Sequence, residues 1–156
     1  MKLRQKIDAI LGKVLMVIMG VMVINVLWQV FSRYLVGIPS SFTDELARYL
    51  MIWLGIIGAA YVSGRKMHVA IDILPSRLSK KSQKKFSIVA NAIIILFCLT
   101  GMVIGGFRLV HMTYTLEQYS PSLQIPLALV YIVIPISGLI IIFYKVLDIL
   151  NLTKDD

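Results

Sequence analysis

Four long apolar segments, separated by short polar stretches, restrict the folds open to this chain more than any other feature. A bilayer core of about 30 Å requires about 20 apolar residues in a helix, and each segment meets or approaches that length. The segments run from about 14 to 32, 44 to 64, 86 to 107 and 125 to 144. We therefore predict an all-α membrane protein of four transmembrane helices, with residues 1–156 forming a single membrane domain.

The composition and charge agree with a membrane protein. Apolar residues make up 58% of the chain, above the roughly 45–50% that is usual for soluble proteins. There are 16 basic residues against 8 acidic ones, for a formal net charge of +8. A nucleic-acid-binding domain would gather such a charge on one face. Here the basic residues cluster between apolar segments, which predicts membrane lipids as partners and no nucleic acid.

The distribution of basic residues predicts the orientation in the membrane. Thirteen of the 16 lie at the two ends of the chain or between the second and third segments. The opposite side has Arg33, Arg48 and Arg108. Because cytoplasmic loops of membrane proteins are enriched in Lys and Arg, we predict that both termini face the cytoplasm.

The stretch 64–85, between the second and third segments, combines apolar residues with a basic cluster. Lysines four apart on a helix repel one another, but they interact favourably with anionic lipid headgroups. We therefore predict an interfacial cytoplasmic segment held at the membrane surface, with a partner contact as the second interpretation. Its membrane-surface lysines are Lys80, Lys81, Lys84 and Lys85.

The second span opens with an aromatic residue and three charges within two turns: Phe42, Asp44, Glu45 and Arg48. One interpretation is structural, because Thr43 is a suitable N-cap and acidic residues are favoured in the first turn of a helix. The functional interpretation is that the four residues form an outward-facing site at which a partner docks. The sequence alone leaves both open.

Polar and small residues within the spans predict contacts between helices. In the first span Asn25 and Gln29 are four apart and share a face, where they would hydrogen-bond to another helix. Small residues at the same spacing allow close backbone approach, either within the chain or against another subunit. The small residues predicted to serve helix packing are Gly55 and Ala59 in the second span and Gly101 and Gly105 in the third.

Several kinds of chemistry lack the residues they need. The apolar cores of the spans contain no Asp or Glu, which disfavours a stand-alone ion-coupled exporter, although that class remains one alternative. The membrane anchor of a redox complex is another, but His68 and His111 are predicted on opposite membrane faces, so they cannot share a haem. Nucleotide-binding and hydrolase motifs are absent, and Cys98 is alone. We expect no enzyme activity, no catalytic or metal-binding residues and no cofactor.

An ordered set of motifs resembles a known family. The stretches are Arg33, Pro39, the run 42–49 (FTDELARY), Trp53, Gly55, 58–60 (GAA), 64–72 (GRKMHVAID), 124–126 (QIP), Tyr131 and Pro135. Together with four spans, they resemble the small membrane subunit of tripartite ATP-independent periplasmic (TRAP) transporters, the DctQ-like proteins. The family commonly has Trp where this chain has Phe42, so a hydrogen bond from an indole N–H is not expected there.

The resemblance implies a function and partners. A periplasmic substrate-binding protein would deliver an organic anion to two subunits in the bacterial inner membrane. The large TRAP membrane subunit would hold the substrate and sodium sites, and the small one would enlarge the scaffold and help dock the binding protein. The resemblance does not distinguish a dicarboxylate, sialic acid or another organic acid as substrate, and it does not give the subunit stoichiometry.

Overall fold

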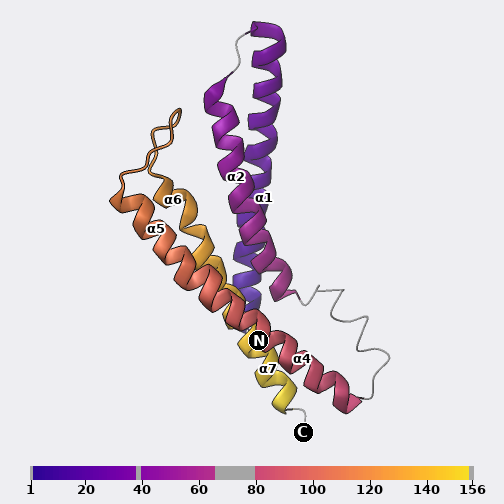
Figure 1. The fold of residues 1–156 in the computed structure, drawn as a ribbon. Helices are drawn as coiled ribbons and strands as arrows, with labels where there is room; N and C mark the ends of the chain where they lie inside the picture. The colour runs from indigo at the N-terminus through magenta and orange to yellow at the C-terminus, as the bar shows by residue number, and fades with distance from the viewer. Residues whose placement is uncertain (1, 38–39, 66–79, 155–156) are drawn as a thin grey trace.

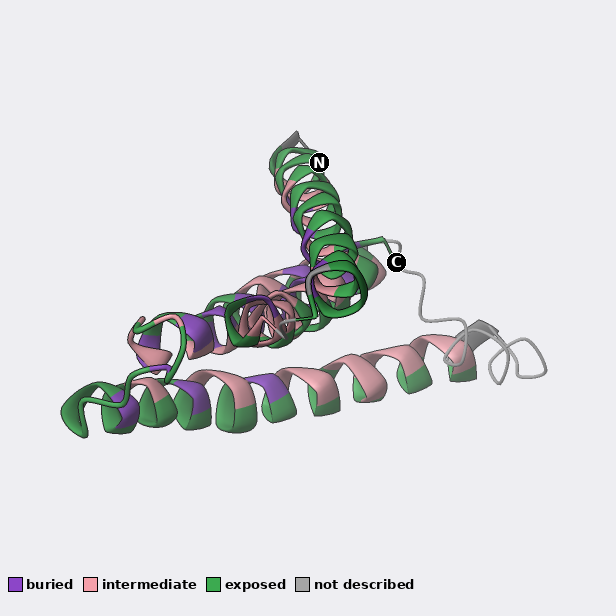
Figure 2. Cartoon of the chain, turned by 90° about the horizontal axis from the view of Figure 1, so that it is seen from above, coloured by how far each residue is buried: buried purple, intermediate pink, exposed green. Residues whose placement is uncertain are grey.

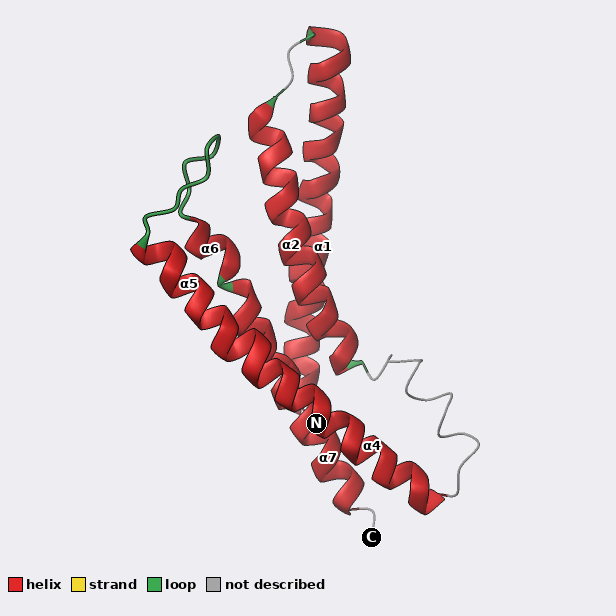
Figure 3. Cartoon of the chain, in the orientation of Figure 1, coloured by secondary structure: helices red, strands yellow, loops and turns green. Residues whose placement is uncertain are grey.

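The computed structural model describes residues 2–37, 40–65 and 80–154, and most of these residues are helical (Figure 3). The elements in chain order are α1 (Lys2–Phe31), η1 (Ser32–Val36), α2 (Ser41–Gly64), α4 (Lys80–Phe97), η3 (Cys98–Gly105), α5 (Gly106–Thr115), α6 (Leu127–Tyr131) and α7 (Val133–Lys154). The segments η1 and η3 are π-helical and continue the helices before them.

The four predicted spans are present. The stretches long and apolar enough to cross a membrane are Leu3–Leu35, Ser41–Gly64, Ser82–Thr115 and Leu127–Leu152. This confirms the four-helix membrane fold. The helices extend past the predicted apolar segments, most of all at the start of α1, because helical structure continues into polar residues that hydropathy alone excludes.

The spans form two antiparallel pairs that meet at one end of the molecule (Figure 1). One pair is α1 with α2, and the other is the long α4–η3–α5 helix with α6 and α7. Both chain termini lie at the end where the pairs meet, which we name the termini end. At the opposite end, the loop end, the pairs separate; it holds the start of α2 and the loop 116–126.

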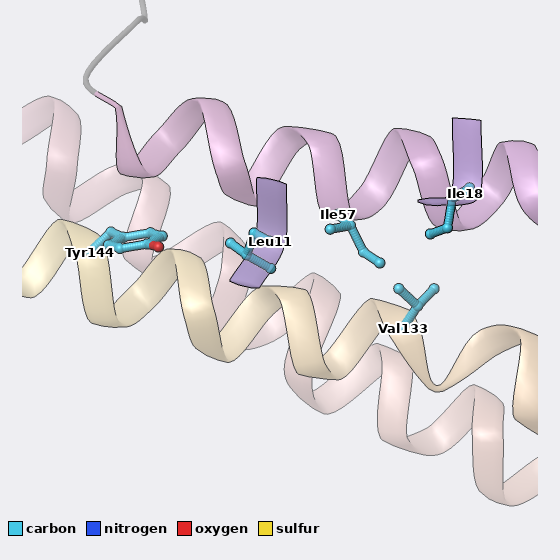
Figure 4. Packing of buried hydrophobic residues seen from close by; sticks show 5 residues of the cluster. All are labelled: Leu11, Ile18, Ile57, Val133 and Tyr144. Carbon is cyan, nitrogen blue, oxygen red and sulfur yellow. The ribbon is translucent and has the colours of Figure 1, made fainter. Parts of the chain in front are cut away.

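The buried core is small and lies between the two pairs. One cluster joins α1, α2 and α7 through Leu11, Ile18, Ile57, Val133 and Tyr144 (Figure 4). A second joins α2, η3 and α7 through Ala60, Cys98 and Ile141, and Cys98 is buried in it.

Most of the apolar surface of the spans faces outward. In the most apolar windows of the first and third spans, 11% and 6% of the residues are buried within the chain. In Figure 2 the α4–η3–α5 helix has an exposed face along its length. Such surface is suited to lipid or to another membrane subunit, and not to water.

The fourth span is interrupted near Pro135. Helix α6 ends at Tyr131 and α7 begins at Val133. Proline lacks the N–H that would bond to the carbonyl of Tyr131, four residues earlier, and its ring crowds that carbonyl. Beside the break, Trp53 Nε1 of α2 donates to the carbonyl of Val130 at 3.0 Å.

Glycines bring the third and fourth spans close together, but they are not the predicted pair. A Cβ added at Gly106 would lie 2.9 Å from Pro135 Cδ, and one at Gly138 would lie 2.8 Å from Met102 Cβ. These two positions therefore require glycine for α7 to approach η3 and α5. Gly101 and Gly105 are exposed on the outer face.

Candidate functional site

The candidate docking residues lie at the loop end, in the first two turns of α2. The helix begins at Ser41, and Ser40 precedes it in an extended conformation. Thr43 therefore lies inside the first turn, where its hydroxyl donates to the carbonyl of Ser40 at 2.9 Å. The prediction that Thr43 caps the helix is wrong, because the helix starts two residues earlier. Phe42 is 50% exposed.

Asp44 and Arg48 form an ion pair one helical turn apart on the surface. The side chain of Arg48 is 74% exposed and that of Asp44 is 48% exposed. An exposed pair of this kind contributes about 0–1 kcal/mol to stability. Both charges are thus accessible to a partner, and the fold depends little on them.

Asn25 and Gln29 connect α1 to this turn. The buried Asn25 side chain donates to the carbonyl of Thr43 at 2.7 Å. One turn later, Gln29 Nε2 donates to Asp44 Oδ1 at 3.2 Å. Their spacing on one face of α1 places both amides opposite α2, which is the geometry of polar residues that join two helices.

Glu45 is bonded within the chain rather than directed outward. Its Oε2 accepts the backbone N–H of Ser122 at 2.8 Å and that of Leu123 at 3.1 Å. Its Oε1 accepts the Tyr49 hydroxyl at 2.8 Å. The sequence carried no signal for the contact with the loop, because the partners lie 77 and 78 residues away and donate through their backbone.

A second polar cluster, which no local pattern in the sequence predicts, lies at the termini end. Arg4 pairs with Asp148 at 2.8 Å, donates to the carbonyl of Gly64, and lies over the Tyr144 ring. The Tyr144 hydroxyl donates to Asp8 Oδ1 at 2.5 Å. This cluster, which we name the termini cluster, joins α1, α2 and α7.

The small residues predicted to serve packing are exposed in the described chain. Gly55 is exposed, with nothing within 4 Å of an added Cβ. Ala59 is exposed as well. An added Cβ at Gly101 or Gly105 would meet atoms of its own helix within that distance. Of the two packing interpretations, contact with another subunit therefore remains as a prediction.

Some predicted residues fall outside what the structure describes. The interfacial segment lies largely in residues 66–79, with His68, and the side chains of Lys80 and Lys81 are also outside the described part. Lys85 is exposed and Lys84 is partly buried at the start of α4. Within the described residues, no three His, Cys, Asp or Glu side chains gather as a metal site.

Comparison with known families decides the class of protein. Residues 22–155 match the family model described as "Tripartite ATP-independent periplasmic transporters, DctQ component". The chain belongs to the DctQ family. It is therefore a multi-pass membrane protein of the small permease subunits of TRAP transporters, and the resemblance seen in its motifs is confirmed.

Three relatives illustrate the DctQ family. The C4-dicarboxylate TRAP transporter small permease protein DctQ of Rhodobacter capsulatus is 33% identical over 109 residues, which cover 69% of this chain and 47% of that protein. The sialic acid TRAP transporter small permease protein SiaQ of Vibrio cholerae is 24% identical over 152 residues, covering 97% and 86%. The isethionate TRAP transporter permease protein DctMQ of Oleidesulfovibrio alaskensis is 27% identical over 95 residues, covering 61% and 15%.

Proposed function

We propose that this DctQ-family chain is the scaffold subunit of a binding-protein-dependent secondary transporter that imports an organic anion across the bacterial inner membrane. The match over residues 22–155 carries the proposal. The placement of the carboxylates supports it. The described Asp and Glu side chains, Asp8, Asp44, Glu45, Glu117 and Asp148, lie toward helix ends or in a loop. Ion-coupling sites commonly use such a group at membrane depth, so we assign sodium coupling to the large subunit.

The large membrane subunit is the proposed partner for the outward faces of the spans. The relative DctMQ supports this partner, because the segment similar to this chain makes up 15% of a much longer permease protein. We propose that the exposed Gly55 and Ala59 of α2, and Gly101 and Gly105 of η3, receive helices of that subunit.

The loop end is the proposed docking site for the periplasmic substrate-binding protein. Phe42 offers an exposed aromatic ring, and Asp44 and Arg48 offer accessible charges. We include Glu45, which lies on the same helix end and contacts the loop 116–126. This assignment requires the loop end to face the periplasm and the termini end, with its basic residues, to face the cytoplasm.

An organic acid is the proposed class of substrate. Two relatives carry a C4-dicarboxylate and sialic acid in their names. We assign the choice among acids to the binding protein and the large subunit, because the buried charged residues Lys145 and Asp148 lie in the second half of α7, after the predicted apolar segment 125–144.

Two other functions are less well supported. A stand-alone four-helix exporter needs a carboxylate in the middle of its spans, which this sequence lacks. A redox-complex anchor needs paired haem ligands. His111 lies in α5 near the loop end, whereas His68, outside the described residues, follows α2 in the sequence. An optical spectrum of the purified chain tests the anchor, since bound haem absorbs strongly in the visible.

Affinity purification from the native host tests the scaffold proposal. The tagged chain, extracted in mild detergent, should co-purify with a much larger polytopic membrane protein. Replacing Gly55 or Ala59 by Leu should reduce that co-purification, because a bulky side chain prevents close backbone approach. Met51→Leu, which alters an exposed residue of α2 with little change in volume, is the matched control. Recovery of the chain alone, under conditions that preserve other membrane complexes, would contradict the proposal.

A further inference from the structure

The contact between Glu45 and the loop 116–126 holds together two parts of the loop end. Glu45 lies in the first two turns of α2, whereas Ser122 and Leu123 lie in the middle of the connection between α5 and α6. Peptide N–H groups bind an ionised carboxylate more strongly than a neutral acceptor, because the bond is charge-assisted. With Tyr49 on its other oxygen, the Glu45 side chain is fixed at both oxygens.

The loop has a defined conformation that presents its tip to Glu45. Its two arms are joined where Ser120 N donates to Ile125 O at 3.0 Å and Leu127 N donates to Gln118 O at 2.9 Å. Gln124 has a φ of 54°, which a non-glycine residue adopts when its surroundings hold the turn in place. The loop is therefore a narrow hairpin-like projection, with Ser122 and Leu123 at its tip.

Exposed groups lie on both elements that the Glu45 contact joins. Tyr119 is 54% exposed on the loop and Phe42 is 50% exposed on α2, with the Asp44–Arg48 pair on the same helix end. Aromatic side chains surrounded by polar and charged groups are characteristic of protein–protein interfaces. The Glu45 carboxylate links the first two turns of α2 directly to the loop tip, while Trp53 links α2 to α6 farther from the tip.

We propose that Glu45 is a positioning residue: its carboxylate fixes the 116–126 loop beside α2, so that the loop tip and Phe42, Asp44 and Arg48 form one docking surface for a soluble protein. The inference rests on the proposed function, because it takes that protein to be the binding protein. It differs from direct docking by Glu45, since the carboxylate acts through the loop.

Amide hydrogen exchange of the purified chain in lipid nanodiscs tests the positioning role without any partner. In Glu45→Gln the charge is lost, and the amides of Ser122 and Leu123 should exchange faster by about an order of magnitude, as expected when a charge-assisted bond is lost. Asp44→Asn is the matched control, because Asp44 bonds to Arg48 and Gln29 and not to the loop. Equal exchange in the wild-type chain and Glu45→Gln would overturn the proposal.

Glu45→Asp separates positioning from direct recognition of charge. It keeps the negative charge but is one methylene shorter, so it should release the loop amides and reduce substrate uptake by the assembled transporter. Uptake equal to wild type in Glu45→Asp, with the loop amides released, would overturn the role of the loop in docking. Failure of the chain to co-purify with a larger subunit would contradict the proposed function, while the exchange result would stand by itself.

Discussion

At the residue scale, the two neighbouring carboxylates at the start of α2 are used differently. Asp44 is paired with Arg48 on the surface, whereas Glu45 is bonded to a distant loop and to Tyr49. The sequence presented them as one group, because adjacent acidic residues are equivalent by composition. On a helix, consecutive side chains point about 100° apart, so neighbours in sequence face different surroundings.

The Asp44–Arg48 pair allows docking to be separated from local stabilisation of the helix. Asp44→Lys should reduce uptake severalfold without lowering the amount of protein in the membrane, because an exposed pair contributes little to folding. In the double variant Asp44→Lys, Arg48→Asp the opposite charges still face one another across one turn. If the partner recognises their positions, uptake should stay low in the double variant, as measured in cells expressing the complete transporter. Recovery of uptake there would favour the structural interpretation.

At the element scale, hydropathy predicted which segments are helices but not which faces meet. The third span shows why. Its GxxxG at Gly101 and Gly105 was expected to pack within the chain or on another subunit, and within the chain Gly106 and Gly138 make the close approach. Residues 98–105 form a π-helix, which has more residues per turn than an α-helix. The face that residues four apart share is therefore rotated relative to the α-helices on either side, and a pattern based on 3.6 residues per turn does not indicate which glycines meet the fourth span.

The end of α2 offers a test of the termini cluster that joins three helices. A Cβ added at Gly64 would lie 2.7 Å from Asp8 Oδ1 and 2.8 Å from the Tyr144 ring. Gly64→Ala should therefore destabilise the fold by about 1–3 kcal/mol, as is typical of overpacking. The measurement is the thermal unfolding midpoint of the purified chain in detergent.

Gly55→Ala is the control for that experiment, because nothing lies within 4 Å of its added Cβ. Alanine is the better helix former, so the control should gain up to about 1 kcal/mol in free energy of unfolding. Its unfolding midpoint should therefore equal or exceed that of the wild-type chain. An equal loss of stability in both variants would show that the effect of Gly64→Ala does not arise from the termini cluster.

At the scale of the whole molecule, the number of spans could be predicted because hydrophobic length is a property of each segment alone. The polar contacts that join the helices at the loop end and at the termini end could not be predicted. At the loop end the partners of Glu45 are backbone groups far along the chain, and at the termini end Arg4 and Asp148 lie 144 residues apart. The sequence predicts that Arg4 belongs to a basic cytoplasmic end. In the structure Arg4 also forms an ion pair with Asp148. Local patterns of charge indicate where a residue lies in a membrane protein, but not which side chain it meets.

The orientation of the two ends in the membrane is open to a direct test with single cysteines. The native Cys98 is buried, so a membrane-impermeant maleimide should leave it unlabelled. Pro121→Cys places an exposed thiol in the loop 116–126, and Lys85→Cys places one at the start of α4 near the other end. Because the basic residues are concentrated at the termini end, labelling of spheroplasts should reach position 121 and not position 85. Labelling at position 85 alone would invert the topology and would place the candidate docking surface in the cytoplasm, beyond the reach of any periplasmic protein.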